Sequence, residues 1–102
     1  MRLSMQTLRI LQLFVESPDA PRYGLEVMEH TGLQSGTVYP ALHRLESNGW
    51  LVSREEEVDA SAAGRPARRL YHLTPTGLAG ALAALEPFRA PSPRAAPKAR
   101  FA

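Results

Sequence analysis

The sequence predicts a mainly α-helical domain with one small β-hairpin. First, apolar residues recur three or four positions apart in four segments of the chain, which is the spacing of an amphipathic helix. Second, two short runs, residues 50–54 and 69–73, have the apolar and aromatic character of strands. Third, proline, glycine and asparagine separate these segments. The predicted order is helix, helix, helix, strand, strand, helix, and 102 residues make one domain.

Two helices open the predicted fold. The first covers residues 2–16, and a segment with two prolines, residues 17–21, ends it. The second covers residues 22–30. Gly32 follows closely and suits the left-handed conformation that commonly closes a helix.

The third helix has the most informative pattern. Ser35 and Thr37 are both favourable N-caps. We expect the start near Thr37, because Pro40 then falls in the first turn, where proline is tolerated. Asn48 and Gly49 end the helix. The predicted inward face consists of Val38, Ala41, Leu42 and Leu45. The predicted outward and flanking positions are Tyr39, Pro40, His43, Arg44 and Ser47.

A hairpin and a last helix complete the prediction. The two strands flank a polar loop of small residues, 55–67. Thr74 and Pro75 are typical of a helix start, with threonine as the N-cap and proline at the first helical position. This helix is expected over residues 75–87. Its apolar stripe consists of Leu78, Leu82 and Leu85. Once three helices and a hairpin are packed, no core is expected to remain for this stripe to cover.

The free stripe and the apolar first helix predict a self-associating face. The expected dimer contacts are Leu3, Leu8, Leu78, Leu82 and Leu85. The domain is expected to comprise residues 1–87, with a dimerisation helix at 75–87. Residues 88–102 contain mainly proline, alanine and basic residues. Such a composition buries too little apolar surface to offset the entropy of ordering, so a disordered tail is predicted.

Charge is unevenly distributed along the chain. Twelve basic and ten acidic residues give a net charge of +2, but four of the basic residues follow residue 88. The remainder has a net charge of −2, so any nucleic-acid-binding surface on it must be local. The clearest basic cluster is the Gly-Arg-Pro-Ala-Arg-Arg run at residues 64–69. The acidic run at residues 55–57 is expected to be a solvated strand end, and the alternative is that it repels DNA phosphate and limits how closely that edge approaches.

Composition argues against several classes of function. The absence of cysteine excludes a disulfide scaffold, a thiolate zinc site and a cysteine nucleophile. His30, His43 and His72 lie on different elements without metal-ligand spacing, so no metal site is predicted. With no phosphate-binding loop or catalytic arrangement, we expect neither a cofactor nor enzymatic activity. No apolar run approaches the roughly 18–20 residues that span a bilayer, and the N-terminus lacks a signal-peptide cleavage site. A cytoplasmic protein without a membrane partner is expected.

Three helices followed by a two-stranded hairpin form a winged helix-turn-helix. In such folds the third helix enters the major groove of double-stranded DNA, and the hairpin, or wing, contacts the flanking backbone. Tyr39, His43 and Arg44 are then expected to contact base edges. The alternative for Tyr39 is packing against the body, but Val38 and Leu42 already fill the inward face. Ser35 and Thr37 are expected to contact phosphates and fix the register.

The predicted wing carries three arginines at positions from which they can reach DNA. Arg65 follows Gly64, where the backbone can come close to a duplex, and is expected to enter the minor groove. Arg68 and Arg69 point to opposite sides of a strand, so one of them is expected to reach a phosphate.

Three linked motifs resemble the PadR family of regulators, over roughly residues 8–80. Residues 31–46, Thr-Gly-Leu-Gln-Ser-Gly-Thr-Val-Tyr-Pro-Ala-Leu-His-Arg-Leu-Glu, are similar to the family's recognition helix. Tyr-Gly-Leu at residues 23–25 is similar to its second helix. Residues 64–74, followed by Gly77, are similar to its arginine-rich wing and the strand behind it.

The resemblance implies a cytoplasmic homodimeric repressor that binds a near-palindromic operator. Many relatives release DNA when a small molecule binds, so an effector is implied without its identity. Relatives commonly continue with a longer dimerising helix, whereas the helix predicted here ends near Pro87. The candidate DNA-binding residues are Tyr23, Ser35, Thr37, Tyr39, Pro40, His43, Arg44, Arg65, Arg68 and Arg69. The alternative is a winged-helix module that binds protein through its hairpin, although a protein-docking wing has no need for three arginines.

Overall fold

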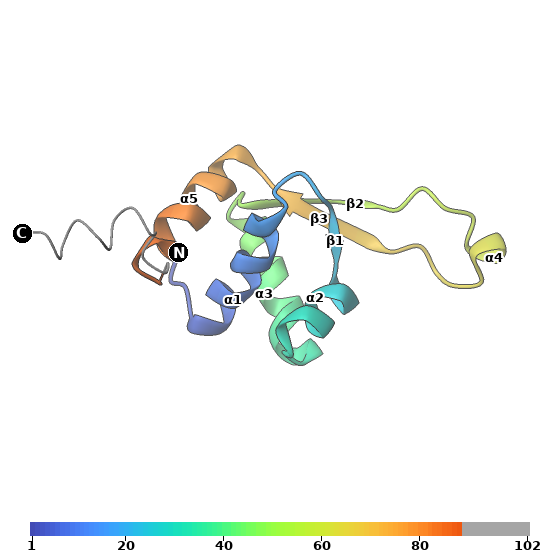
Figure 1. Cartoon of the computed structure of the whole chain (residues 1–102). Helices are drawn as coiled ribbons and strands as arrows, with labels where there is room; N and C mark the ends of the chain where they lie inside the picture. The colour runs from blue at the N-terminus through green and yellow to red at the C-terminus, as the bar shows by residue number, and fades with distance from the viewer. Residues whose placement is uncertain (89–102) are drawn as a thin grey trace, which may run out of the picture.

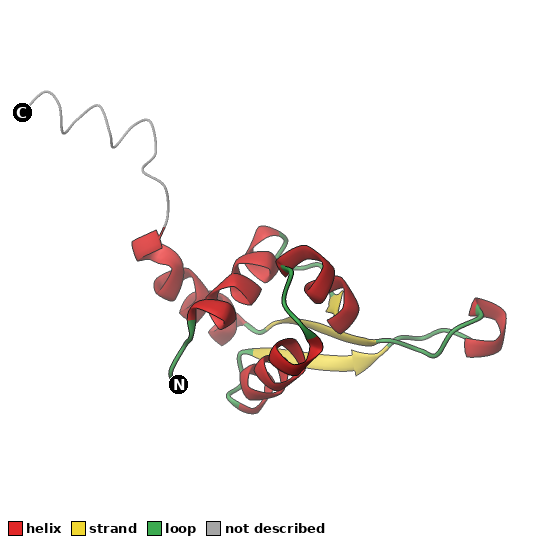
Figure 2. Cartoon of the chain, turned by 90° about the horizontal axis from the view of Figure 1, so that it is seen from below, coloured by secondary structure: helices red, strands yellow, loops and turns green. Residues whose placement is uncertain are grey.

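The computed structural model describes residues 1–88 of the chain. Its helices form a body from which a long β-hairpin projects, with a short helix at the tip of the hairpin (Figure 1, Figure 2). The elements in order are α1 (Met5–Glu16), β1 (Arg22–Tyr23), α2 (Gly24–Thr31), α3 (Ser35–Ser47), β2 (Leu51–Glu55), α4 (Ala60–Ala63), β3 (Arg69–Leu73), α5 (Pro75–Leu85) and a 3₁₀ turn, η1 (Glu86–Phe88). The predicted helical fold with a wing is confirmed. The predicted tail falls almost entirely on residues 89–102, which lie outside the described residues.

The core lies where α1 crosses the other helices. Phe14, Ile10 and Leu11 of α1 are fully buried, as are Leu42 and Leu45 of α3. Ser4 caps α1, because its hydroxyl accepts a hydrogen bond from the Thr7 amide at 3.1 Å. The buried residues of α3 are Val38, Ala41, Leu42 and Leu45, which confirms the predicted inward face.

The helix-turn-helix consists of α2 and α3. Gly32 closes α2 with a φ of 74°, as the sequence predicts. The predicted start of α3 near Thr37 is wrong, since the helix begins at Ser35 and the amides of Thr37 and Val38 both donate to the Gln34 carbonyl. Pro40 therefore lies inside the helix. The hydrogen bond lost there is the one to the carbonyl of Gly36, an exposed residue whose carbonyl water can satisfy.

The sheet has three strands in the order β1-β3-β2, all antiparallel, rather than the predicted two. Strand β1 pairs Arg22 with Tyr71 and Tyr23 with Leu70. Two residues are too few to show a strand pattern, so the sequence predicted the start of a helix there. The second unpredicted element is α4, within the loop between β2 and β3, where Asp59 caps a single turn of small residues.

Helix α5 packs against α1 and against Trp50, the residue before β2. The Thr74 hydroxyl accepts from the Gly77 amide at 2.9 Å, which confirms the predicted cap. A Cβ added at Gly77 would lie 1.9 Å from the Trp50 carbonyl oxygen, so glycine is required for this close approach. The expectation that the α5 stripe has no core to cover is wrong for Leu85, which is buried in the chain's own core.

The other residues predicted at the dimer face divide in the same way. Leu8 is buried in the core, Leu3 and Leu78 are partly buried against it, and Leu82 is 47% exposed.

None of the helices in residues 1–88 has the length and apolar character that a membrane span requires.

Candidate nucleic-acid interface

The outward face of α3 is a row of exposed polar and small side chains. Pro40, His43, Arg44 and Ser47 are exposed, and Tyr39 is 47% exposed, as the periodicity predicts. These positions fall on one side of the helix because Val38, Ala41, Leu42 and Leu45 occupy the other. The face thus offers a ring nitrogen, a guanidinium and hydroxyls to a partner.

The side chains of this face are not engaged within the chain. Among residues 1–88, the structure shows no hydrogen bond or ion pair for the side chains of Ser35, Thr37, His43 or Arg44. Each therefore keeps its full hydrogen-bonding capacity for a partner molecule.

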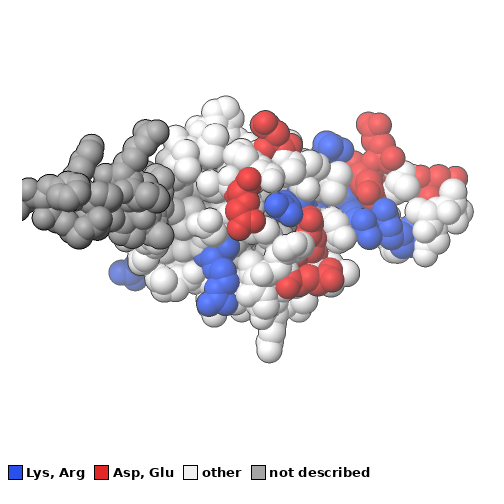
Figure 3. Space-filling view, viewed as in Figure 1, with Lys and Arg blue, Asp and Glu red and all other residues white. Residues whose placement is uncertain are grey.

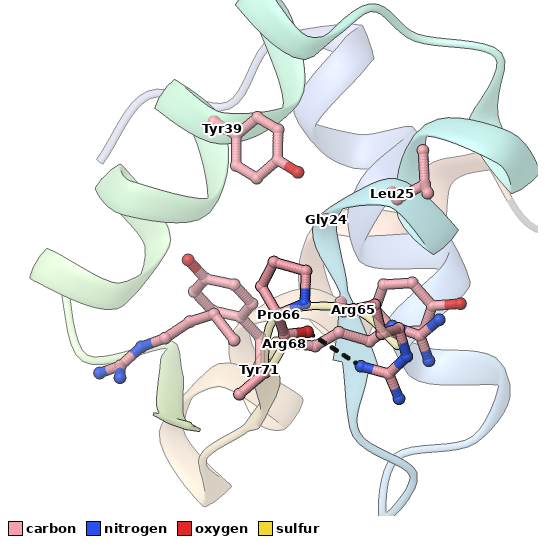
Figure 4. Close-up of a pocket in the computed structure, with 10 residues that line it drawn as sticks. Gly24, Leu25, Tyr39, Arg65, Pro66, Arg68 and Tyr71 are labelled. Carbon is pink, nitrogen blue, oxygen red and sulfur yellow. Dashed lines mark hydrogen bonds between the residues drawn. The ribbon is translucent and has the colours of Figure 1, made fainter. Parts of the chain in front are cut away.

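The Tyr39 ring packs α3 against the start of α2. A Cβ at Gly24 would lie 2.3 Å from its ring, so the first residue of α2 must be glycine for the ring to lie there. In Figure 4 the Tyr39 ring points from α3 toward Gly24, and Pro66 and Tyr71 of the wing lie on the other side of the pocket that these residues line. Tyr39 thus packs against the body on one side and remains open on the other, so its packing is observed while its contact with DNA stays a prediction.

Arg65 is bound to Glu56 across the loop that joins β2 to β3, which we call the wing tip. Its Nη1 donates to Glu56 Oε1 at 2.7 Å and Nη2 donates to Oε2 at 3.4 Å. Hydrogen bonding to Arg65 lowers the pKa of the Glu56 carboxyl, so the carboxylate stays ionised at neutral pH. The expectation that Glu56 is simply a solvated strand end is wrong, because the hairpin brings the two residues together.

Arg68 lies over an aromatic ring. Its guanidinium carbon is 4.1 Å from the centre of the Tyr23 ring, a cation–π arrangement between the wing and β1. Tyr23 therefore supports the wing. The residue before it, Arg22, has its partner within the body: Arg22 Nη1 donates to Glu26 Oε2 at 3.1 Å, while Arg22 Nε is buried without a hydrogen-bond partner in the described part of the chain.

Arg69 is the third wing arginine and is exposed. Its Nε donates to Ser53 Oγ at 3.0 Å, and the Ser53 hydroxyl in turn donates to the Glu46 carboxylate at the end of α3. This chain of hydrogen bonds connects the end of α3 to both strands of the wing. Tyr71, paired with Ser53 across the sheet, is half-buried beside it, and burial and the nearby Glu46 raise its pKa.

A pocket of about 360 Å³ lies between α2, α3 and the wing (Figure 4). Five of the predicted DNA-binding residues line it: Tyr23, Tyr39, Arg65, Arg68 and Arg69. The other five do not line it and belong to α3: Ser35, Thr37, Pro40, His43 and Arg44. The pocket also includes Gly24, Leu25 and Tyr71, which sequence reasoning did not assign to the site.

Acidic and basic side chains lie side by side on the wing rather than forming one basic surface (Figure 3). Glu55 faces Arg69 in the strand register, which places Glu56 opposite Arg68 at the next position. That register was the signal that could have identified Glu56. Residues 1–88 contain no group of three His, Cys, Asp or Glu side chains placed to hold a metal ion.

A helix-turn-helix whose exposed second helix lies beside an arginine-containing hairpin defines a winged-helix protein of the kind found in transcriptional regulators. Comparison of the sequence with known families gives a match to the transcriptional regulator PadR-like family over residues 10–81. The chain belongs to this family, whose members are regulators of transcription and not enzymes.

Individual relatives agree with the family assignment. The transcriptional regulator Rv3488 of Mycobacterium tuberculosis is 57% identical over 44 residues, an alignment that covers 43% of this chain and 36% of that protein. The chain therefore spans about a third of the length of this relative.

Solved structures confirm the fold. The Streptococcus mutans UA159 protein smu.1704 has a TM-score of 0.65 at 25% identity, with 86% of this chain and 83% of that chain covered. A structure described as a PadR-like transcription factor from "bacteroid fragilis" has a TM-score of 0.67 at 22% identity, covering 82% and 80%. The transcriptional regulator BldR of Sulfolobus solfataricus also has a TM-score of 0.67 at 22% identity, covering 84% and 55%.

Proposed function

We propose that the protein is a sequence-specific repressor that binds a near-palindromic DNA operator as a homodimer. The observation that carries this proposal is the outward face of α3, where the side chains of His43 and Arg44 are exposed and form no hydrogen bond or ion pair within the described residues. Base edges in the major groove are recognised by such side chains on a helix. The arginine-containing wing lies beside this helix and can contact the flanking backbone.

Each part of the surface has its own role in this proposal. Tyr39, His43 and Arg44 contact base edges and choose the sequence. Ser35 and Thr37, in the first turn of α3, bind phosphates and fix the register. In the wing, Arg69 is exposed and has only one of its donors committed, to the Ser53 hydroxyl, so it supplies sequence-independent affinity.

The homodimer is proposed to form through α1 and α5. Apolar side chains remain exposed in this region, with Met5 of α1 at 64% and Phe88 of η1, the turn after α5, at 59%. These two side chains line a hollow of about 210 Å³ whose floor includes Leu8 and Leu85. An exposed apolar surface next to a partly open hollow favours association with a second copy. Leu82 of α5, which is 47% exposed, adds to this apolar surface.

Selection of bound fragments from genomic DNA by the purified protein tests the function. We expect recovery of a common motif with two half-sites about 10 base pairs apart, centre to centre. Light scattering at tens of micromolar protein should give the mass of two chains. Fragments with no common motif would contradict sequence-specific binding, and a single-chain mass would contradict the dimer.

A further inference from the structure

Glu56 occupies the point where the hairpin ladder ends and the wing tip begins. Its amide donates to the Arg68 carbonyl at 2.8 Å, and its Oε1 accepts from the Arg68 amide at 3.3 Å. The same carboxylate binds both terminal nitrogens of Arg65. One acidic side chain therefore closes the tip loop and determines where the Arg65 side chain lies.

The three wing arginines differ in what binds them. Arg68 lies over the neutral Tyr23 ring, and Arg69 donates to the neutral Ser53 hydroxyl, so neither guanidinium is hydrogen-bonded to a carboxylate of the described residues. Arg65 alone of the three is in an ion pair, and Nη1 also donates to the Pro66 carbonyl at 3.1 Å. A phosphate that approaches the Nη1–Nη2 edge of Arg65 must displace a carboxylate that already binds it, and one that approaches Nε meets the negative charge of that carboxylate nearby.

The pair is accessible to DNA. The Arg65 and Glu56 side chains are 32% and 23% exposed, and both belong to the projecting wing (Figure 1). Glu56 thus competes directly with any phosphate that approaches, both by holding the Arg65 donors and by repelling the phosphate. This competition bears most on complexes that depend on phosphate contacts alone.

We propose that Glu56 is a selectivity-determining residue that withholds Arg65 from phosphates and so lowers affinity for DNA of random sequence. The proposal rests on the proposed function. In a non-specific complex the wing is free to place Arg65 on any nearby phosphate. On an operator the contacts of α3 fix the position of the wing, so releasing Arg65 adds less.

The test compares Glu56→Gln with Glu57→Gln. Both variants remove one negative charge from the wing, but the Glu57 side chain is exposed and has no partner among the described residues. Glutamine keeps an oxygen that can accept from the Arg68 amide, and the wing lies away from the buried core. Each variant and the wild type are titrated against operator and random duplexes over a salt series.

Glu56→Gln should raise affinity for the random duplex by on the order of three- to tenfold at low salt, with a salt slope steeper by about 0.9, the value for one added phosphate contact. The operator should gain less, so the ratio of operator to random affinity falls. Glu57→Gln should change the slope much less. In the double variant E56Q/R65A the gain should disappear.

Equal effects of E56Q and E57Q would overturn the proposal, because only net charge would then matter. Weaker binding of both duplexes by E56Q would also overturn it, because Glu56 would then simply order the wing. A wild-type protein that binds neither duplex would instead contradict the proposed function, which keeps the two failures apart.

Discussion

Both α3 and the wing carry basic side chains, but those on the outward face of α3 have no partner among residues 1–88, whereas those on the wing are bound by neighbouring side chains. On α3, the outward side chains of His43 and Arg44 have no partner within the described residues. On the wing, Arg65, Arg68 and Arg69 are each held by a neighbouring side chain. A count of positive charges would rank the wing as the main DNA contact, whereas the contacts favour α3 for recognition.

The difference follows from how the two elements are stabilised. A helix forms its hydrogen bonds within itself, and the inward face of α3 anchors it, so its outer side chains are free. A two-stranded hairpin that projects into water is marginal without additional contacts. In this wing the arginines supply those contacts, to Glu56, Tyr23 and Ser53.

The anchoring of α3 can be broken from its inward side. Leu42 is fully buried, so Leu42→Ala should lower the free energy of unfolding by about 2–5 kcal/mol. His43→Ala, one position along on the exposed face, should change it by less than about 0.5 kcal/mol. Urea denaturation measures both. Similar losses for the two variants would show that the helix is not anchored through one face.

Removing a free side chain tests recognition directly. Arg44→Ala should weaken operator binding by about 1–3 kcal/mol, because a base contact would be lost. Affinity for random DNA should fall much less. Fluorescence anisotropy with both duplexes measures this difference, and an equal loss on both would assign Arg44 to a phosphate.

The approach of α3 to DNA can be tested at Gly36. A Cβ added there meets no atom of the chain within 4 Å, so Gly36→Ala should keep the fold and raise the free energy of unfolding by up to about 1 kcal/mol. Operator affinity should nevertheless fall, because the added methyl group lies where the first turn of α3 meets the duplex. A variant that is more stable and binds as before would place this turn away from DNA.

The smallest expected effect concerns the packing of the wing on β1. Tyr23→Leu should lower stability by roughly 0.5–1 kcal/mol beyond Tyr23→Phe, because only phenylalanine keeps a ring beneath the Arg68 guanidinium. Thermal unfolding of the two variants gives the difference. Identical midpoints would mean that the cation–π contact contributes nothing.

Periodic signals predicted most of the fold. The inward face of α3, the Gly32 cap and the Thr74 cap are local patterns that tertiary structure did not alter. The start of α3 was mispredicted because an exposed glycine four residues before Pro40 leaves the affected carbonyl open to water. Strand β1 was missed because two residues show no period, and it exists only through pairing with β3.

The exposed side chains of α3 were predicted, but the contacts that the wing arginines form were not. Exposure of the α3 face follows from helical spacing alone. The binding of Arg65 to Glu56 depends on how a long loop folds back, and nine positions separate the two residues. Leu85 was assigned to a dimer face because the sequence does not show that α5 returns to cover α1.

The central claim is that α3 reads the base sequence, whereas Arg69 of the wing supplies affinity that does not depend on the sequence. The most direct measurement is the ratio of operator to random-DNA affinity for Arg44→Ala and for Arg69→Ala, taken at one salt concentration. We predict that Arg44→Ala lowers the ratio, while Arg69→Ala weakens both duplexes equally and leaves it unchanged. A ratio that falls for Arg69→Ala and stays constant for Arg44→Ala would contradict this division of roles.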